Sequence, residues 1–219
     1  MAEWAALFDM DGVIVDTNPF HQEAWRGFCR AHHKNLSEAD LAEHVWGRIN
    51  RDILGFLFGQ DISEAQVEVL GEAKEAMFRD LARGKLPPVA GLPGFLAGLQ
   101  GQGIPMAVAT SAPPSNVEFV MAETGLEHYF AACVDSTAVT QGKPAPDIYL
   151  AAAKKLGVAP ERCVVFEDSL SGIQAGRNAG MAVVGVATTH SREELARLTD
   201  LCVSDFTQLP VDRVAALAG

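Results

Sequence analysis

The sequence predicts an α/β fold, a doubly wound parallel sheet with a module of helices inserted after its first strand. Two patterns lead to this prediction. Along most of the chain, short and nearly all-apolar segments alternate with amphipathic ones, which is the alternation of strand and helix that such a sheet requires. One long stretch, residues 18–83, instead has helical periodicity and no convincing strand.

The strands are recognised by their length and composition. Each candidate is too short for a helix, and most are almost entirely apolar, as expected of parallel strands covered by helices on both faces. The predicted strands are residues 4–8, 105–109, 131–134, 163–166, 182–186 and 201–203. Amphipathic periods between them predict helices over residues 115–123, 147–156, 170–179 and 192–198.

The inserted stretch suggests a small helical bundle. Its helical segments lie around residues 21–31, 38–45, 51–58 and 63–81. The chain leaves this stretch through residues 85–91, where a pair of prolines stiffens the backbone and Gly91 permits a turn. We therefore predict an α/β core made of residues 1–16 and 88–219, and a helical domain made of residues 17–87.

Composition narrows the class of protein. The chain has 219 residues, of which 48% are hydrophobic and 21% are charged, as is typical of a globular protein. A formal net charge of −11 disfavours a nucleic-acid partner and an anionic membrane, both of which attract basic surfaces. An anionic small substrate would need a local cation or a metal ion to offset this charge.

Cysteine usage and the N-terminal residues indicate the compartment. The four cysteines are far apart and form no CxxC pair, so zinc binding and redox chemistry are not indicated. The first residues lack the basic and apolar regions of a signal peptide, and the longest apolar run, residues 179–187, is too short to cross a bilayer. We expect a cytoplasmic protein that is a monomer or a weak dimer.

Two acidic residues follow the first predicted strand, in the order Asp9-Met10-Asp11-Gly12. Ligands of an open α/β sheet bind at the carboxyl ends of its strands, so both carboxylates are expected in a functional site. Their period of two places them on one side of the chain, where they repel each other unless a cation separates them. Mg²⁺ suits carboxylates beside a phosphate. A turn in which an aspartate caps the next element would give the same short motif.

Hydroxyl and basic residues follow the next two strands. Thr110-Ser111 ends the strand at 105–109, where hydroxyl and N–H groups can hold phosphate oxygens, although a helix N-cap is the commoner use of these residues. Lys143 lies in Gly142-Lys143-Pro144-Ala145-Pro146-Asp147. The two prolines stiffen its backbone, which suggests that Lys143 offsets the charge of Asp9 and of a transferring phosphoryl group.

Two further acids, Glu167 and Asp168, end the strand at 163–166. Helix capping by Asp168 or Ser169 explains them in part, but two adjacent acids at a strand end are costly without a cation. Together the four motifs supply a nucleophile, a phosphate clamp, a cation and a metal ligand at one edge of one predicted sheet. The combination predicts a magnesium-dependent phosphotransfer enzyme with Asp9 as the nucleophile.

These motifs, in this order, resemble those of the haloacid dehalogenase superfamily, and closely those of its β-phosphoglucomutase-type branch with a helical cap. The resemblance rests on residues 8–17, 110–111, 143–147 and 166–169 and covers nearly the whole chain. The resemblance implies the fold of that family and a role for each motif in the reaction.

The resemblance implies an aspartyl-phosphate on Asp9, with Asp11 as general acid and base. It further implies that Thr110 and the Ser111 amide hold the phosphoryl oxygens, and that Lys143 neutralises the developing charge. A Mg²⁺ ion would be bound by Asp9, the main-chain carbonyl of Asp11 and Asp168, with Glu167 as an outer or alternative ligand. The carboxylic acid at position 11 points to phosphoester chemistry, because dehalogenating members of the family lack it.

The resemblance also implies that the inserted helices determine substrate specificity. His21 and Lys74 fall where the mutase branch has a histidine and a lysine, and residues 46–52 resemble its substrate-specificity loop. Arg48 or Arg51 is therefore a candidate clamp for a distal phosphate. The loop also departs from the mutase pattern, because Trp46 replaces a lysine and Asn50 replaces an arginine.

The turn after Thr110 departs from the mutase pattern too, since Ala112-Pro113-Pro114 replaces polar and basic residues. We therefore prefer a phosphatase of small phosphorylated metabolites, sugar phosphates in particular. A β-phosphoglucomutase-type mutase is the alternative. A third reading, a phospho-accepting receiver module without enzymatic activity, is disfavoured because receivers carry the acceptor on a middle strand and have no helical insertion.

Overall fold

The computed structural model describes residues 3–45 and 50–219. The chain divides into two compact units, one made of Met1–Asp16 with Leu86–Gly219 and the other of Thr17–Lys85. The second unit ends two residues before the boundary predicted at residue 87. Among the described residues, no helix combines the length and the apolar character that crossing a membrane requires.

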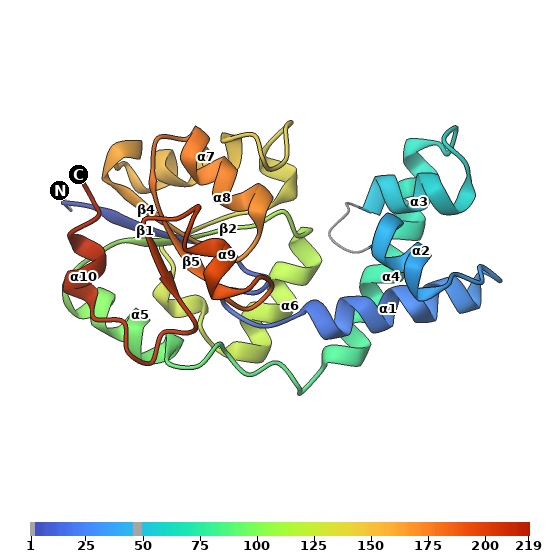
Figure 1. Cartoon of the computed structure of the whole chain (residues 1–219), viewed down its shortest axis with the longest axis horizontal. Coiled ribbons are helices and arrows are strands. Elements are labelled where there is room, and N and C mark those ends of the chain that lie inside the picture. Colours follow the sequence, from blue (N-terminus) through green and yellow to red (C-terminus); the bar gives the residue numbers. More distant parts are fainter. Residues whose placement is uncertain (1–2, 46–49) are drawn as a thin grey trace. The chain divides into compact units, whose positions relative to one another are not determined.

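A six-stranded parallel sheet forms the centre of the first unit (Figure 1). Its strands lie in the order β3-β2-β1-β4-β5-β6. They are β1 (Ala5–Phe8), β2 (Met106–Ala109), β3 (Ala132–Val134), β4 (Cys163–Glu167), β5 (Ala182–Val186) and β6 (Leu201–Val203). Each strand coincides with a predicted segment to within one residue at either end, so the predicted parallel α/β fold is confirmed.

The strand order brings the ends of β1 and β4 together. In the register, Phe8 of β1 pairs with Val108 of β2 on one side and with Phe166 of β4 on the other. Just beyond the strand, the N–H of Asp9 donates to the carbonyl of Phe166 at 3.0 Å. The order of the strands reverses at this point of the sheet, where open α/β proteins bind their ligands. Asp9 and Glu167 therefore lie next to each other at the ends of adjacent strands.

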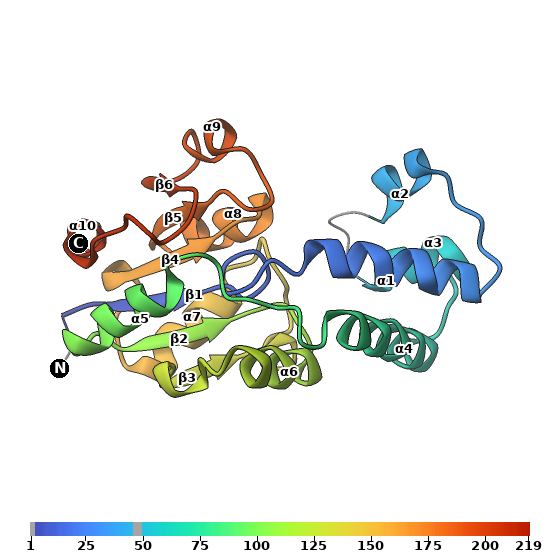
Figure 2. The same cartoon turned by 90° about the horizontal axis from the view of Figure 1, so that it is seen from below.

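Helices connect the strands and cover both faces of the sheet (Figures 1 and 2). They are α5 (Leu92–Gly101), α6 (Pro114–Thr124), α7 (Asp147–Leu156), α8 (Leu170–Asn178), α9 (Arg192–Leu195) and α10 (Val211–Ala215), with short 3₁₀ turns η1 (Glu127–Tyr129), η2 (Ser136–Ala138) and η3 (Pro160–Arg162). Helices α5 and α10 were not predicted, because α5 is rich in glycine and α10 is only five residues long. Helix α9 is shorter than the predicted 192–198, and Leu195 is the one residue of α9 that is buried.

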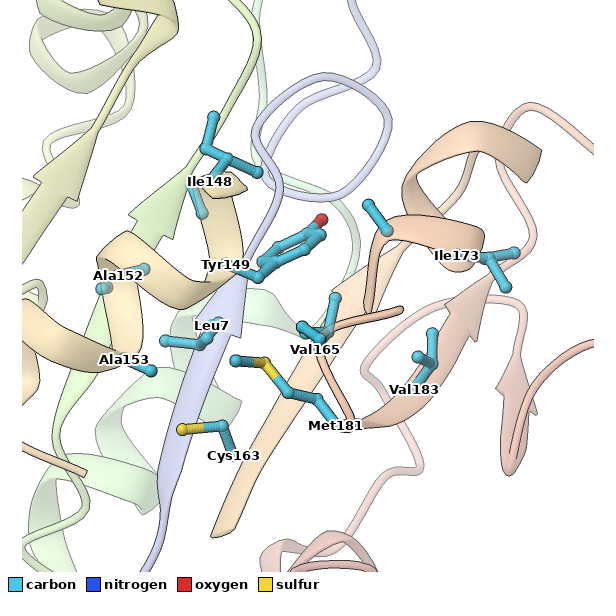
Figure 3. Close-up of a cluster of buried hydrophobic side chains, with 14 of the residues drawn as sticks. Leu7, Ile148, Tyr149, Ala152, Ala153, Cys163, Val165, Ile173, Met181 and Val183 are labelled. Atoms are coloured by element: carbon cyan, nitrogen blue, oxygen red, sulfur yellow. The ribbon is translucent and has the colours of Figure 1, made fainter. Parts of the chain in front are cut away.

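Alternation along β1 divides the core of the first unit into two layers, because successive side chains of a strand point to opposite faces. Leu7 belongs to the same buried cluster as Tyr149 of α7 and Ile173 of α8 (Figure 3). On the other face, the ring of Phe8 stacks on Phe166 with centroids 4.5 Å apart, and Phe95 of α5 meets both rings edge-on. Burying each such side chain contributes about 1.5–3 kcal/mol.

The second unit consists of helices α1 (Asn18–Ala31), α2 (Glu38–His44), α3 (Asn50–Phe58) and α4 (Glu64–Ala82). Capping boxes begin two of them, because the side chains of Ser37 and Ser63 accept hydrogen bonds from the third residue of α2 and of α4. The four helices share an apolar core that includes Trp25, Phe28 and Leu54. A helix therefore forms in every segment where the period predicted one, whereas the role of this unit as a cap stays a prediction.

Candidate active site

Asp9 lies at the centre of the carboxyl edge of the sheet. Its residue is only 7% exposed, because the chain turns back directly after it. The carbonyl of Met10 accepts hydrogen bonds from the N–H groups of Val13, Ile14 and Val15, which closes a tight loop. The loop keeps the carboxylate at the end of β1 and away from solvent.

Gly12 lets this loop approach the end of β4. Its φ is +79°, a conformation that disfavours other residues. A Cβ atom at this position would lie 1.8 Å from Oδ2 of Asp168, so no larger side chain fits without displacing that carboxylate. The glycine of the Asp9-Met10-Asp11-Gly12 motif is thus required for the contact between the two acidic segments.

Lys143 joins the two acidic segments. Its Nζ lies 2.9 Å from Oδ1 of Asp9 and donates to Oε1 of Glu167 at 2.6 Å. The side chain is only 7% exposed, and the Lys143–Pro144 peptide bond that holds it is cis. Burial alone would lower the pKa of Lys143, but the two carboxylates hold this pKa above its ordinary value. The lysine is therefore charged wherever the protein is folded.

Glu167 is fully buried and fully hydrogen-bonded. Oε1 accepts from Lys143 and, at 2.9 Å, from the hydroxyl of Tyr149. Oε2 accepts from the N–H groups of Asp168 and Ser169, each at 2.9 Å, and from the Ser169 hydroxyl at 3.0 Å. Burial opposes ionisation, but Lys143 and these donors keep the pKa of Glu167 below its ordinary value. Glu167 thus acts as an anchor for its neighbours.

Asp168 is 3% exposed, and hydroxyl groups at the end of β5 hold it. Thr189 donates to Oδ2 of Asp168, and Thr188 Oγ1 lies 3.4 Å from the same oxygen. The Thr188 hydroxyl also donates to the carbonyl of Gly12 at 2.5 Å. Burial, and then the charge of Glu167, raise the pKa of Asp168 to about 7. Asp168 therefore holds its proton more strongly than an exposed aspartate does.

The three carboxylates fit a bound divalent cation. Asp9, Glu167 and Asp168 each offer an oxygen, and these oxygens lie within 4.8 Å of one another. Burial and the neighbouring acids also raise the pKa of Asp9, against the opposing charge of Lys143. Oδ1 of Asp9 is buried and, among the described residues, accepts no well-directed hydrogen bond although Lys143 is close. Three acids around one ammonium form a donor set of hard oxygens with excess negative charge, which can hold a metal ion.

The other core residues singled out in the sequence lie beside this group. Asp11 is half-buried in the loop after β1, and its carboxylate is not one of the three clustered oxygens, although its charge adds to the raised pKa of Asp9. Thr110 is 1% exposed; its N–H donates to the carbonyl of Val134 at 2.9 Å, and its Oγ1 accepts from the N–H of Ala112 at 3.1 Å. Ser111 is exposed.

Three of the residues named in the helical unit form a group with a fourth, Glu75. Lys74 Nζ lies 2.9 Å from Nδ1 of His21 and donates to Oε1 of Glu75 at 2.8 Å. The Asn50 amide donates to the same oxygen at 2.8 Å. Burial opposes ionisation of Glu75, but Lys74 and His21 keep its pKa below the ordinary value. We refer to these four residues as the helical-unit cluster.

The two arginines proposed as phosphate clamps are in other places. Arg51 forms an ion pair with Glu64 on the exposed surface of the helical unit, so it takes no part in the helical-unit cluster. Arg48 lies outside the described residues.

Sequence reasoning missed four residues that hold these groups together. They are Tyr149, Thr188, Thr189 and Glu75. Thr188 and Thr189 follow a predicted strand, so the rule that selected Thr110 would have found them too. Tyr149 and Glu75 gave no such signal, because each sits inside a helix whose period already explained it.

Known proteins resemble this chain along most of its length. A family model described as haloacid dehalogenase-like hydrolase matches residues 5–180. The chain is 35% identical to the fructose-1-phosphate phosphatase YqaB of Escherichia coli over 82% of this chain and 94% of the relative. It is 33% identical to the β-phosphoglucomutase of Mycobacterium bovis over 94% of this chain and 90% of the relative.

Solved structures agree with these sequence relatives. A family IA, variant 3 HAD hydrolase from Entamoeba histolytica superposes with a TM-score of 0.91 at 29% identity, over 98% of this chain and 99% of that one. The motif order, the sheet topology and these likenesses lead to one conclusion, which the sequence predicted: the chain belongs to the haloacid dehalogenase-like hydrolases.

Proposed function

We propose that the protein is a magnesium-dependent phosphatase of small sugar phosphates that works through an aspartyl-phosphate on Asp9. The observation that carries this proposal is the contact of Lys143 with both Asp9 and Glu167, at 2.9 and 2.6 Å. The contact sets one fixed cation against the carboxylate that is to attack, and the two side chains are only 7% and 10% exposed. Within such a site, fixed charges stabilise a transition state far better than they would in solvent.

The first step is attack by an Asp9 carboxylate oxygen on the phosphorus of the ester. The new P–O bond to Asp9 forms as the bond to the sugar oxygen breaks, and Asp11 gives its proton to that leaving oxygen. In the second step a water molecule gives a proton to Asp11 and attacks the phosphorus. The bond to Asp9 breaks and inorganic phosphate leaves. Splitting the reaction in this way returns both acids to their starting states.

Three other residues would hold the phosphoryl group. The Thr110 hydroxyl and the Ser111 N–H lie at the end of β2, next to β1 in the sheet, and are the proposed donors to its oxygens. Lys143 would offset the charge that builds up between Asp9 and phosphorus. In this proposal, the residues that bind phosphate and the nucleophile come from adjacent strand ends.

The acidic cluster would hold Mg²⁺, with Asp9 and Asp168 as side-chain ligands and the Asp11 carbonyl as a further ligand. Glu167 would support the site from outside, because both of its oxygens already accept hydrogen bonds. When bound, the ion supplies positive charge that keeps the carboxylates ionised and draws electron density from the phosphoryl oxygens.

Sugar phosphates are the proposed substrates because several relatives are named as phosphatases of such compounds. They include proteins named fructose-1-phosphate phosphatase and phosphorylated carbohydrates phosphatase, each 35% identical to this chain. The helical-unit cluster offers a lysine, an amide and an imidazole, groups that suit sugar hydroxyls. Its own glutamate already matches the charge of Lys74, which makes it a poor receptor for a second phosphate.

A screen of phosphorylated sugars with Mg²⁺ tests the proposal when free phosphate and isomerised product are measured together. We expect phosphate release from several sugar monophosphates, and none from the Asp9→Asn variant. Release that continues in Asp9→Asn would contradict the role of Asp9.

A β-phosphoglucomutase-type activity is the second candidate, because the mutase relative aligns over 94% of this chain. In that case a second sugar hydroxyl, rather than water, would take the phosphoryl group from Asp9. Incubation with β-glucose 1-phosphate, Mg²⁺ and a trace of bisphosphate separates the two. Glucose 6-phosphate as the main product would replace our proposal with the mutase.

A further inference from the structure

Tyr149 brings a hydroxyl group into a buried cluster of apolar side chains. The residue is fully buried in α7, and its ring packs in the same cluster as Leu7 and Val165 (Figure 3). The ring alone would serve that packing, and a phenylalanine would fill the same volume. A hydroxyl buried at this depth is unfavourable unless it is hydrogen-bonded, so its bond partner indicates what it does.

The hydroxyl of Tyr149 donates to Oε1 of Glu167 at 2.9 Å. That oxygen is also the acceptor for Lys143, at 2.6 Å. Two donors, one from the loop before α7 and one from α7 itself, thus converge on one carboxylate oxygen. Because Oε2 is held by the backbone at Asp168 and Ser169, the Tyr149 bond fixes the remaining freedom of the carboxylate.

Tyr149 also contacts the lysine itself. Nζ of Lys143 lies 5.1 Å from the centre of the Tyr149 ring, within the range of a cation–π interaction. The tyrosine therefore restrains the ammonium in two ways: directly, through the contact with its ring, and indirectly, through the hydrogen bond to Glu167. The third neighbour of the ammonium is Asp9, at 2.9 Å.

We infer that Tyr149 is a positioning residue for phosphoryl transfer: it anchors Glu167 so that the Lys143 ammonium is shared between Glu167 and the nucleophile Asp9. Without the hydroxyl, Oε1 of Glu167 has lost one of its two donors and draws the ammonium more strongly. Lys143 then moves towards Glu167 and away from Asp9. This inference rests on the proposed function of Asp9 and goes beyond it, because Tyr149 touches neither substrate nor metal.

The test compares Tyr149→Phe with Tyr129→Phe, since the chain has only these two tyrosines. Tyr129 lies in η1 and is partly exposed. We expect Tyr149→Phe to lower kcat roughly tenfold, the lower end of what loss of an outer hydrogen-bond partner does at such sites, with KM and Mg²⁺ affinity unchanged. Tyr129→Phe should leave kcat unchanged. A purely structural role for Tyr149 would instead lower thermal stability and leave kcat intact, and that result overturns the inference.

A second measurement does not depend on turnover. Lys143 is buried against two carboxylates, so acetic anhydride in trace amounts should label it far more slowly than the exposed Lys154, as measured by mass spectrometry. We expect Tyr149→Phe to lower the labelling of Lys143 relative to Lys154 several-fold, because Glu167 then holds the ammonium more tightly, and unchanged or faster labelling overturns the inference. If the parent protein releases phosphate from no ester, the proposed function fails, and the labelling result alone still decides whether Tyr149 positions Lys143.

Discussion

Two groups of buried charged side chains, one in each unit, differ in how their charges are balanced. At the edge of the sheet, three carboxylates surround the single ammonium of Lys143. In the helical-unit cluster, one carboxylate, Glu75, faces one ammonium, Lys74. Both groups are shielded from water to a similar extent, so burial alone does not distinguish them. The balance of charge does.

The difference appears in the titration of the acids. At the sheet edge, burial and mutual repulsion raise the pKa of Asp9 and of Asp168. In the helical-unit cluster, the neighbouring lysine outweighs burial and keeps the pKa of Glu75 low. A balanced group is complete in itself, whereas an unbalanced one is complete only with a further cation. The comparison thus separates a group whose charges are matched from one that has an excess of negative charge and can hold a cation.

The largest effect is expected from Asp9→Asn. The change removes the proposed nucleophile, and we expect kcat to fall by at least about 10³-fold. The amide also relieves charge repulsion at the sheet edge, so the metal-free variant should melt no lower than the parent. Steady-state kinetics and thermal melts measure both. Asp61→Asn, which removes one exposed charge, is the matched control and should change neither quantity.

The next effect is on stability in the helical unit. Glu75→Gln removes the carboxylate that Lys74 contacts at 2.8 Å, and losing one partner of a buried ion pair typically costs about 3–5 kcal/mol. Replacing both partners in Lys74→Met/Glu75→Gln leaves no uncompensated charge, so the double variant should be more stable than Glu75→Gln. Urea unfolding of both variants gives the free energies. A double variant that is less stable than Glu75→Gln would show that the two charges do not balance each other.

Two glycines sharpen the comparison further. A Cβ atom at Gly172 would lie 1.6 Å from Oε1 of Glu167, whereas one at Gly71 would lie 3.7 Å from the amide nitrogen of Asn50. Gly172→Ala should therefore displace Glu167, destabilise the protein by about 1–3 kcal/mol as overpacking does, and lower kcat. Gly71→Ala should be neutral or stabilise α4 by up to about 1 kcal/mol. Unfolding curves and steady-state kinetics of the two variants measure these effects on stability and kcat. Equal behaviour of the two variants would contradict this picture of a closely packed sheet edge.

The smallest effect concerns pH. The pKa of Asp168 is about 7 in the folded protein, against an ordinary value of 3.8, so folding is favoured by the proton on this group. That contribution is complete below the ordinary pKa and is lost as the pH rises through about 7. Between about pH 4 and pH 7 the metal-free protein should therefore lose up to about 1.4 kcal/mol per pH unit, and above pH 7 this group should cause no further loss.

Mg²⁺ should offset this loss, so that the ion raises the melting temperature more at pH 8 than at pH 6. Asp168→Asn should flatten the dependence on pH between these values. Thermal melts with and without Mg²⁺ provide the measurement. A stabilisation by Mg²⁺ that is as large in Asp168→Asn as in the parent would place the ion elsewhere.

The sheet could be predicted from the sequence because each strand is a short apolar run that can be recognised from its own residues alone. The segments at 182–186 and 201–203 coincide with β5 and β6 to the residue. Helix α5 could not be predicted, since its three glycines weaken the helical pattern and its burial comes from the tertiary fold. Local propensity therefore located the strands, whereas packing produced some of the helices.

The candidate site follows the same division. Residues at strand ends, such as Asp9 and Asp168, were found because ligands of open parallel sheets bind at the carboxyl ends of the strands. Tyr149 and Glu75 were not found, because an interior helix position looks alike whether its hydroxyl or carboxylate has a partner or not. Only the folded chain shows that Tyr149 shares an acceptor with Lys143.

The hydrogen bond from Thr188 to the Gly12 carbonyl spans 176 positions of the chain. The loop that carries Asp9 is synthesised well before its partners at the ends of β4 and β5. A nascent chain that has reached Lys143 holds the proposed nucleophile and its cation yet lacks Glu167 and Asp168. Contacts this distant in sequence also form late in folding. The proposed site can therefore be completed only after β5 and Thr188 have been synthesised, so a fragment that stops before β5 should lack activity.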